Sequence, residues 1–391
     1  MYSKKHSYML TLGHLCTDLN QGAISAMLPF VIAHYGFSYA RASMLVLGCS
    51  IVSSVVQPLF GWMGDRFQRP WLMSLGIFLA GFGIFMMGLF STFLPLFCCT
   101  MLTGVGIALF HPEGGRLANV VAGANKGTGI GNFAVGGNLG FAVGPLLVAL
   151  TFPYLGMRGA LIFIIPALIA SVLLLTQNRK FTELSVLEEK RKKKAGELGL
   201  KDNWREFWKV TTVNIMRSVI SRSHLVFIPL FWVAIFNQSD ANGAMMITIF
   251  TFVGAFATFL GGRIADRIGF KNEIIICGVL MTLSIFGFLF AQNIILAGIL
   301  VILTSVFINL AYSPIVALSQ GYLPNHIGLA SGISLGVVVS MGAVAAPFLG
   351  MVGDAHGLLT VFVIICIVSF VSLVFSLFLK NDKAVSSSSG R

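Results

Sequence analysis

Long apolar runs recur along this chain, and they limit what it can fold into. Residues 70–110 contain no Asp, Glu, Lys or Arg, and comparable runs follow in the rest of the sequence. A run of about 18 or more apolar residues is long enough to cross the roughly 30 Å of bilayer hydrocarbon as a helix. A transmembrane barrel would need strands of about ten residues with alternating polarity, which the sequence lacks. The sequence therefore predicts an all-α membrane protein.

The distribution of charge agrees with a membrane protein. Only 10% of the residues are charged, against about 25% in a typical soluble domain. The net charge is +12, and ten of the 26 Lys and Arg residues lie within 179–209. Most of the others fall in short loops, as in proteins with positively charged cytoplasmic loops, so we expect no nucleic-acid partner. The six cysteines lack CxxC spacing and predict buried thiols, with no metal and no cofactor.

Gly, Pro and charged residues divide the apolar sequence into twelve predicted transmembrane helices. The spans are 7–30, 39–62, 71–90, 93–119, 127–151, 157–176, 208–236, 242–263, 273–292, 294–319, 328–352 and 357–379. Basic residues fall mainly in alternate loops, so both termini are expected in the cytoplasm and the chain in a bacterial inner membrane. Asp18 interrupts the first apolar stretch, which we interpret as a retained span rather than a signal peptide.

One long polar segment separates two groups of six spans. The predicted parts are an N-terminal lobe, a basic cytoplasmic linker, a C-terminal lobe, and a disordered tail or cloning scar, at 1–176, 177–207, 208–380 and 381–391. Opposite charges spaced i,i+4 on a helix attract each other. The linker is therefore expected to form a surface helix with the pairs Glu188–Lys192 and Glu189–Lys193.

The two halves repeat each other. GWMGDRFQR at 61–69 is matched by GRIADRIGFK at 262–271, at an offset of 201 residues. GFAVGP at 140–145 returns as GAVAAP at 342–347, and Pro112 as Pro314, both at an offset of 202. Three matches at a nearly constant offset indicate a duplication. Parallel six-helix repeats are typical of one transporter architecture, in which the substrate site lies near the membrane midplane.

The repeated motifs resemble those of the major facilitator superfamily. The G-x-x-x-D-R loops after spans two and eight are similar to its signature, and the glycines of span five resemble its antiporter motif, with Val148 and Ala149 in place of a final glycine pair. The segments 57–65, 111–116 and 136–147 resemble its fosmidomycin resistance protein branch. The resemblance implies two six-helix repeats around a central cavity, lined by spans one, four, seven and ten.

Two of these cavity helices carry ionisable groups, which are costly in hydrocarbon and therefore informative. In span one, a histidine, an acid and a glutamine share one helix face, and span seven carries two arginines and a histidine. We predict that these residues bind substrate: His14, Asp18, Gln21, Arg217, Arg222 and His224. Asp18 is also a predicted proton carrier. The alternatives are that the arginines extend to the headgroups, that Asp18 only bonds a neighbouring helix, and that His14 and His224 are buried neutral rings bonded to carbonyls.

The sequence HPEGGR at 111–116 places three ionisable groups at the cytoplasmic end of span four. Its repeat partner SPIVAL at 313–318 keeps the proline but has no acid or arginine. Glu113 and Arg116 are spaced i,i+3 and are predicted to pair. With His111 they are a candidate proton relay or inner gate, with Glu113 as the second proton carrier. The alternative is that they only anchor the helix end at the interface.

The repeated loops and span five supply the remaining candidates. The family resemblance implies that Asp65, Arg66, Asp266 and Arg267 close the cytoplasmic face by charge pairs and helix-end contacts. Small residues on one helix face allow a second helix to approach closely, which we predict for span five. Its candidates for helix packing are Gly136, Gly140, Gly144 and Pro145.

These observations predict a proton-coupled secondary transporter that exports a small, acidic drug or metabolite by alternating access. Burial can bring a carboxyl group into the range where it exchanges protons near neutrality, and guanidinium suits acidic ligands. Proton-coupled uptake of a metabolite anion is the alternative, and a non-transporting membrane sensor is a third hypothesis. No Walker, HExxH or GxSxG motif is found, so we do not expect an enzyme. The expected partners are substrate, protons and lipid, and a monomer is compatible with the sequence.

Overall fold

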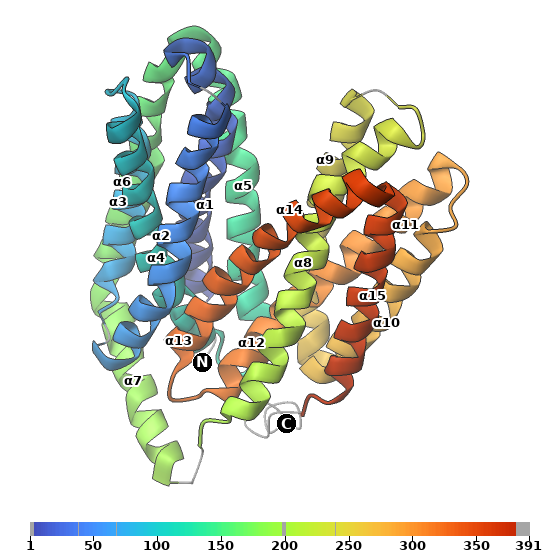
Figure 1. Cartoon of the computed structure of the whole chain (residues 1–391). Helices are drawn as coiled ribbons and strands as arrows, with labels where there is room; N and C mark the ends of the chain where they lie inside the picture. The colour runs from blue at the N-terminus through green and yellow to red at the C-terminus, as the bar shows by residue number, and fades with distance from the viewer. Residues whose placement is uncertain (1–3, 38, 68, 198–200, 239, 381–391) are drawn as a thin grey trace. The chain divides into compact units, whose positions relative to one another are not determined.

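The computed structural model describes residues 4–37, 39–67, 69–197, 201–238 and 240–380, and within these ranges every regular element is a helix (Figure 1). The all-α class predicted from the apolar runs is thus confirmed. In an α-helix the backbone N–H and C=O groups bond to one another, which is required in a membrane because hydrocarbon offers them no hydrogen-bond partners.

The first six predicted spans each correspond to a helical segment. The segments are α1 (Lys4–Tyr35), α2 (Tyr39–Phe67), α3 (Trp71–Met87), α4 (Phe93–Ala122), α5 (Lys126–Leu155), and η1 (Gly156–Phe163) continued by α6 (Ile164–Thr176). Most of these helices extend beyond the predicted ends. The predicted ends lie where the apolar run stops, but the helix continues for further turns into the polar residues that follow.

The second six spans also correspond to helical segments, two of them divided. The segments are α8 (Trp204–Ala234), α9 (Asp240–Ile268), α10 (Phe270–Phe288), α11 (Ile294–Leu310) with α12 (Tyr312–Tyr322), α13 (Ile327–Gly332) with η2 (Ile333–Val337) and α14 (Val338–His356), and α15 (Leu358–Leu377). The break between α11 and α12 lies just before Pro314, which has no backbone N–H to bond to the preceding turn.

Some of the helices are too short or too polar to be recognised as membrane spans from length and hydropathy alone. Within the described residues, eight helical stretches meet the length and hydropathy expected of one. The first and seventh predicted spans, α1 and α8, are not among them. These two helices are more polar because they carry the histidines, acid and arginines from which the sequence predicted the functional site.

The chain forms two compact units that differ slightly from the two sequence halves. The first unit consists of Met1–Gly123, Asn132–Asp202 and Pro324–Val337, and the second of Ala124–Gly131, Asn203–Leu323 and Val338–Arg391. The start of α5 therefore belongs to the second unit, and α13 with η2 belongs to the first. In each half of the sequence, the beginning of one helical segment packs in the unit that consists mainly of the other half.

Each unit has its own hydrophobic core. In the first unit the core includes Met27, Phe152 and Phe163, all fully buried. In the second it is rich in aromatic rings, with the ring centroids of Phe288 and Phe362 4.8 Å apart. Side chains on the outside of the helices, such as Ile169 and Val172 of α6, are apolar and exposed, as a lipid-facing surface requires.

The linker forms helix α7 (Asn178–Glu197), as predicted. Its Phe181 is fully buried, and the ring lies 5.5 Å from that of His6. The predicted pairs Glu188–Lys192 and Glu189–Lys193 involve side chains outside the described part of the chain, as does the tail 381–391. The linker helix is therefore attached to the first unit through its apolar face.

Candidate functional site

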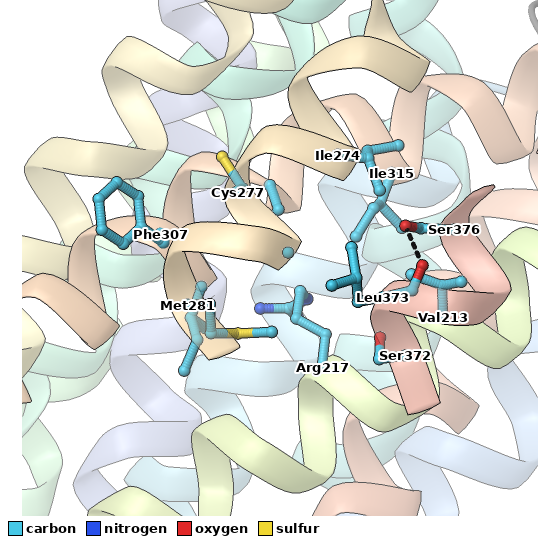
Figure 2. A pocket seen from close by; sticks show the side chains of 13 residues that line it. Val213, Arg217, Ile274, Cys277, Met281, Phe307, Ile315, Ser372, Leu373 and Ser376 are labelled. Carbon is cyan, nitrogen blue, oxygen red and sulfur yellow. Dashed lines mark hydrogen bonds between the residues drawn. The ribbon is translucent and has the colours of Figure 1, made fainter. Parts of the chain in front are cut away.

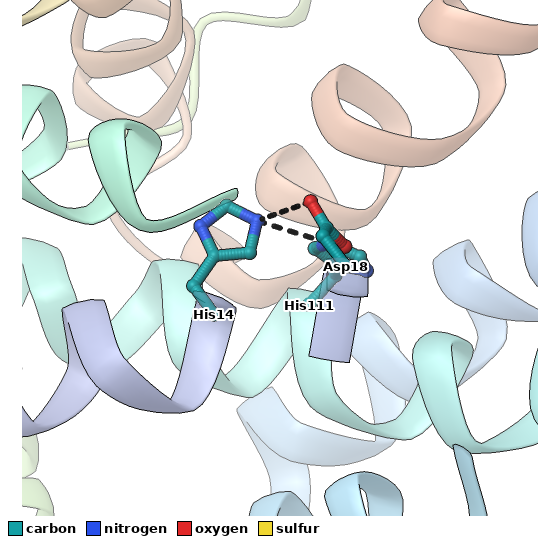
Figure 3. Close-up of side chains that lie close together, drawn as sticks. All are labelled: His14, Asp18 and His111. Carbon is teal, nitrogen blue, oxygen red and sulfur yellow. Dashed lines mark hydrogen bonds and ion pairs between the residues drawn. The ribbon is translucent and has the colours of Figure 1, made fainter. Parts of the chain in front are cut away.

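Two helices of the first unit bring two imidazoles and one carboxylate together. His14 and Asp18 lie one turn apart on α1, and His111 lies on α4 (Figure 3). The Nε2 atoms of His14 and His111 are each 3.1 Å from a different oxygen of Asp18, and 3.1 Å from each other. All three residues are at most 5% exposed. Among the described residues, this is the one group of three such side chains whose ligand atoms lie within 4.8 Å of one another.

The second nitrogen of each ring is directed at a backbone carbonyl. His14 Nδ1 lies 2.6 Å from the oxygen of Phe133, and His111 Nδ1 lies 3.1 Å from that of Ile107. A carbonyl oxygen only accepts hydrogen bonds, so each Nδ1 carries its hydrogen and donates it. Each Nε2 is therefore the nitrogen that gains or loses a proton, and both face Asp18.

Helix α5 approaches this cluster through its glycines. A Cβ atom on Gly136, Gly140 or Gly144 would lie 2.1–2.4 Å from a carbonyl oxygen of α1, which is closer than atoms can pack. A Cβ atom on Gly137 would lie 2.6 Å from both Asp18 Oδ2 and His14 Nε2. The predicted packing role of the glycines is seen here at the polar cluster itself, whereas Pro145 lies further along the helix. Gln21, half-buried, makes no hydrogen bond to the cluster among the described contacts.

The HPEGGR sequence serves two places, because residues two positions apart point to opposite sides of a helix. His111 faces Asp18, whereas Glu113 and Arg116 form a bidentate ion pair as their spacing predicts. Arg116 Nη2 lies 2.6 Å from Glu113 Oε1 and Arg116 Nε lies 2.9 Å from Oε2. Both side chains are at most 5% exposed. Arg116 also donates to the hydroxyl of Ser185 on α7, 2.8 Å away.

The aspartates of the repeated loops bind the starts of helices. Asp65 accepts hydrogen bonds from the backbone N–H groups of Gly328 and Leu329, at 2.9 and 3.0 Å, within the first unit. Asp266 accepts from the N–H groups of Gly127 and Thr128, at 2.9 and 2.8 Å, within the second. A carboxylate is favoured at a helix N-terminus because the N–H groups there lack partners within the helix.

The arginines that follow these aspartates make no hydrogen bond to those helix starts among the described contacts. Arg66 places its guanidinium 4.3 Å above the ring of Trp62, as an amphipathic interface residue does. Arg267 lies in the last turn of α9. The geometry thus matches the helix-end contacts that the sequence predicted, and a gating role for Arg66 and Arg267 stays a prediction.

In the second unit the candidate residues lie on α8. Arg217 is 8% exposed, donates to Asn214 Oδ1 at 3.1 Å, and lies 4.6 Å from the ring of Tyr312. His224 is 2% exposed and its Nδ1 lies 2.8 Å from the carbonyl oxygen of Ile220. The surroundings of His224 are those of a buried ring bonded to a carbonyl, which was the alternative to ligand binding. Arg222 is half-buried.

Comparison with known proteins identifies the family. The sequence model of the major facilitator superfamily matches residues 10–333 and 210–391. The chain belongs to the major facilitator superfamily. It is therefore a multi-pass membrane transporter, and its family and fold are not those of enzymes.

Two bacterial relatives extend this result. An uncharacterized superfamily transporter of Bacillus subtilis, YfnC, is 30% identical over 365 residues, covering 88% of this chain and 85% of the relative. The fosmidomycin resistance protein of Escherichia coli is 26% identical over 352 residues, with the same coverage. The resemblance noticed in the motifs of the first half therefore extends over most of the chain.

Solved superfamily structures share the fold. The transporter FucP, in its outward conformation, matches with a TM-score of 0.76 at 12% identity, covering 96% of this chain and 98% of FucP. The proton:xylose symporter XylE matches with a TM-score of 0.74 at 16% identity, covering 97% and 98%. At these identities the likeness shows the fold of a superfamily transporter.

Sequence reasoning missed several residues of the site. The carbonyl of Phe133 and the hydroxyl of Ser185 carry no pattern that marks them. Glu273 is the first residue of the predicted span 273–292, at an end where a carboxylate is expected to contact water. It is instead 2% exposed, and neither of its oxygens has a hydrogen-bond partner. Its position three residues inside α10 was hidden by an uncertain helix start.

Proposed function

We propose that this superfamily transporter exchanges protons for a small acidic compound and so exports it from the cytoplasm. The observation that supports proton coupling is the cluster of His14, Asp18 and His111. Because both Nδ1 atoms donate to carbonyls, a neutral pair of rings would present two bare Nε2 atoms to each other and to a carboxylate. Atoms with only lone pairs repel at 3.1 Å. A proton on one of these atoms would turn the repulsion into attraction, and this supports proton coupling through the cluster.

Loss of that proton would convert attraction into repulsion. In the buried cluster this change is large, because the Coulomb energy of two charges rises as the effective dielectric constant falls. The groups near Asp18 are His14 on its own helix, His111 on α4 and the thiol of Cys49 on α2. From α5, Gly137 and Gly140 lie against it and bring no titratable group. A cluster without its proton would thus push α1 and α4 apart.

Helix packing gives this repulsion a mechanical consequence. The backbone of α5 is already as close to α1 as glycine allows, so a displacement of Asp18 would be transmitted to α5. We infer that proton binding and release bias the helices between two packed arrangements, which is what alternating access requires. The buried pair of Glu113 and Arg116, on the opposite side of α4, is proposed to sense the same movement at the cytoplasmic end.

Export of an acidic compound has separate support. The relative from Escherichia coli is named for resistance to fosmidomycin, and export of a toxic compound is one way in which a membrane transporter can confer resistance. Arg217 and Arg222 place positive charge on a membrane helix, and guanidinium favours ligands with acidic groups.

Proton flux in liposomes tests this proposal. Purified protein is reconstituted with a pH-sensitive dye inside, and fosmidomycin is added outside as the first probe. We expect proton movement opposite to the probe, its loss in Asp18→Asn, and its retention in Asp354→Asn, which changes an exposed carboxylate of α14. Protons and probe moving in the same direction would mean uptake.

Two outcomes would overturn the coupling mechanism. Normal pH-driven flux in Asp18→Asn would remove the cluster from it. Two imidazoles and a carboxylate could instead surround a metal ion, so flux is also measured after treatment with a chelator. Flux that stops with the chelator and returns on addition of a divalent metal would contradict a cluster that works with protons alone.

A further inference from the structure

A cavity inside the second unit is built around an arginine without an acidic partner. It is enclosed by α8, α10, α11, α12 and α15, and the guanidinium of Arg217 points into it (Figure 2). Apart from Asn214 and the ring of Tyr312, Arg217 has no partner in the described part of the chain, and no carboxylate oxygen there lies within ion-pair distance. Asn214 binds only Nε, so the two terminal nitrogens have donors to spare.

An unpaired guanidinium in this position is costly. Burying a charge costs several kcal/mol unless another group compensates it, and two buried acids of this chain have such a compensating group. Glu113 is paired with Arg116 and Glu206 with Lys209. Arg217 has only an amide oxygen and an aromatic ring, neither of which carries a negative charge.

Extension of the side chain to the membrane surface does not account for Arg217. It lies nine residues after Trp208, an exposed aromatic residue near the start of α8, or about 13 Å along the helix at 1.5 Å per residue. Its side chain is directed at the cavity (Figure 2) and is 8% exposed. Among the described residues that line the cavity, none carries a negative charge that could neutralise the guanidinium of Arg217.

The cavity wall indicates the size and charge of a ligand. Its lining is mainly apolar, with Cys277, Met281 and Leu373 among the side chains, while Ser372 offers a hydroxyl without a partner among the described contacts. The free volume is about 20 Å³, which is roughly the room of one water molecule. A single-atom anion or the end of one carboxylate fits this room. A doubly charged tetrahedral anion would be too large and would lose too much hydration.

We propose that the cavity at Arg217 binds a small monovalent anion. The terminal nitrogens of Arg217 and the hydroxyl of Ser372 donate to it, and its charge neutralises the buried guanidinium. The anion comes either from solution, as a halide, or from an organic acid that inserts its carboxylate. This binding needs neither proton coupling nor transport, so it can be measured on protein in detergent.

Anion-dependent thermal stability tests the site. Purified protein is heated in sodium gluconate, whose anion is too large for the cavity, with chloride, formate or sulfate replacing it at constant ionic strength. We expect saturable stabilisation by chloride, with the melting temperature rising by about 3–6 °C at ten times the dissociation constant. Sulfate should have no such effect. Formate that competes with chloride would show that the site accepts a carboxylate, and formate without effect would leave a halide as the ligand.

Three variants show whether the effect belongs to this cavity. Arg217→Met should abolish the chloride response, whereas Arg205→Met, which removes an exposed charge from the same helix, should retain it. Cys277→Leu fills the cavity but keeps the guanidinium, and it should lose the response even if Arg217→Met does not fold. No chloride response in the unmodified protein, or an equal response in Arg217→Met or Cys277→Leu, would overturn the proposal. Because transport is not measured, loss of proton flux in liposomes would leave the result unaffected.

Discussion

The buried pair of Glu113 and Arg116 gives the sharpest test of how charge is used in this transporter. Two short hydrogen bonds, of 2.6 and 2.9 Å, join side chains that are almost inaccessible to water. Removing one partner of such a pair leaves a buried charge uncompensated and costs about 3–5 kcal/mol, whereas removing both costs much less. Arg116→Met should therefore lower stability more than the double variant with Glu113→Gln does.

The exposed pair of Lys180 and Glu183 is a matched control. It has the same i,i+3 spacing and a distance of 3.0 Å, but its side chains are 53% and 47% exposed. Exposed pairs contribute little because water and salt screen them. The single changes Lys180→Met and Glu183→Gln should leave stability unchanged and should show no coupling to each other.

Thermal unfolding of the two sets of variants measures the difference. A loss of about 3–5 kcal/mol corresponds to a fall in melting temperature on the order of 10 °C for a unit of this size. The four proteins of each set form a double-mutant cycle, whose coupling energy should be large for the buried pair. The double variant of Glu113 and Arg116 should fold but lack proton-coupled flux. Small, additive effects on both stability and flux would refute the argument and make HPEGGR only an interfacial anchor.

Two further predictions concern packing and burial. Gly140→Ala should lower the free energy of unfolding by about 1–3 kcal/mol, because the added methyl would lie 2.4 Å from the carbonyl oxygen of Leu15. The control Gly350→Ala, whose methyl would meet no atom within 4 Å, should be neutral or stabilising. Equal melting temperatures of the two variants would contradict the close approach of α5 to α1. Glu206→Gln should lower the free energy of unfolding by about 1–3 kcal/mol, because it removes the charged partner of Lys209. Glu273→Gln should lower it little, because neither oxygen of that carboxyl has a hydrogen-bond partner. If urea or heat unfolding ranks the two variants in the reverse order, Glu273 is ionised and bound.

The helices and several local pairs could be predicted because they depend on spacing along the chain. His14 and Asp18 share a face since they are one turn apart, and Glu113 and Arg116 pair for the same reason. The one-sided glycines of α5 likewise predicted a close helix contact. The apolar runs were enough to predict the fold class, and the repeated G-x-x-x-D-R loops with the glycines of span five were enough to show the resemblance to the family.

Other features depend on which helices pack together, and spacing does not contain that information. His111 meets Asp18 across 93 positions of sequence, and Asp65 binds the N–H of Gly328 across 263. HPEGGR was interpreted as one unit, but helix rotation directs His111 to α1 and Glu113 to the other side. The burial of Glu273 and the cavity at Arg217 likewise follow from tertiary packing. The sequence by itself determined the periodic, local order of this protein, because helix geometry is fixed by 3.6 residues per turn. Only the tertiary structure decided which of its charges have partners on other helices and which have none, because that depends on the side chains that distant helices place around them.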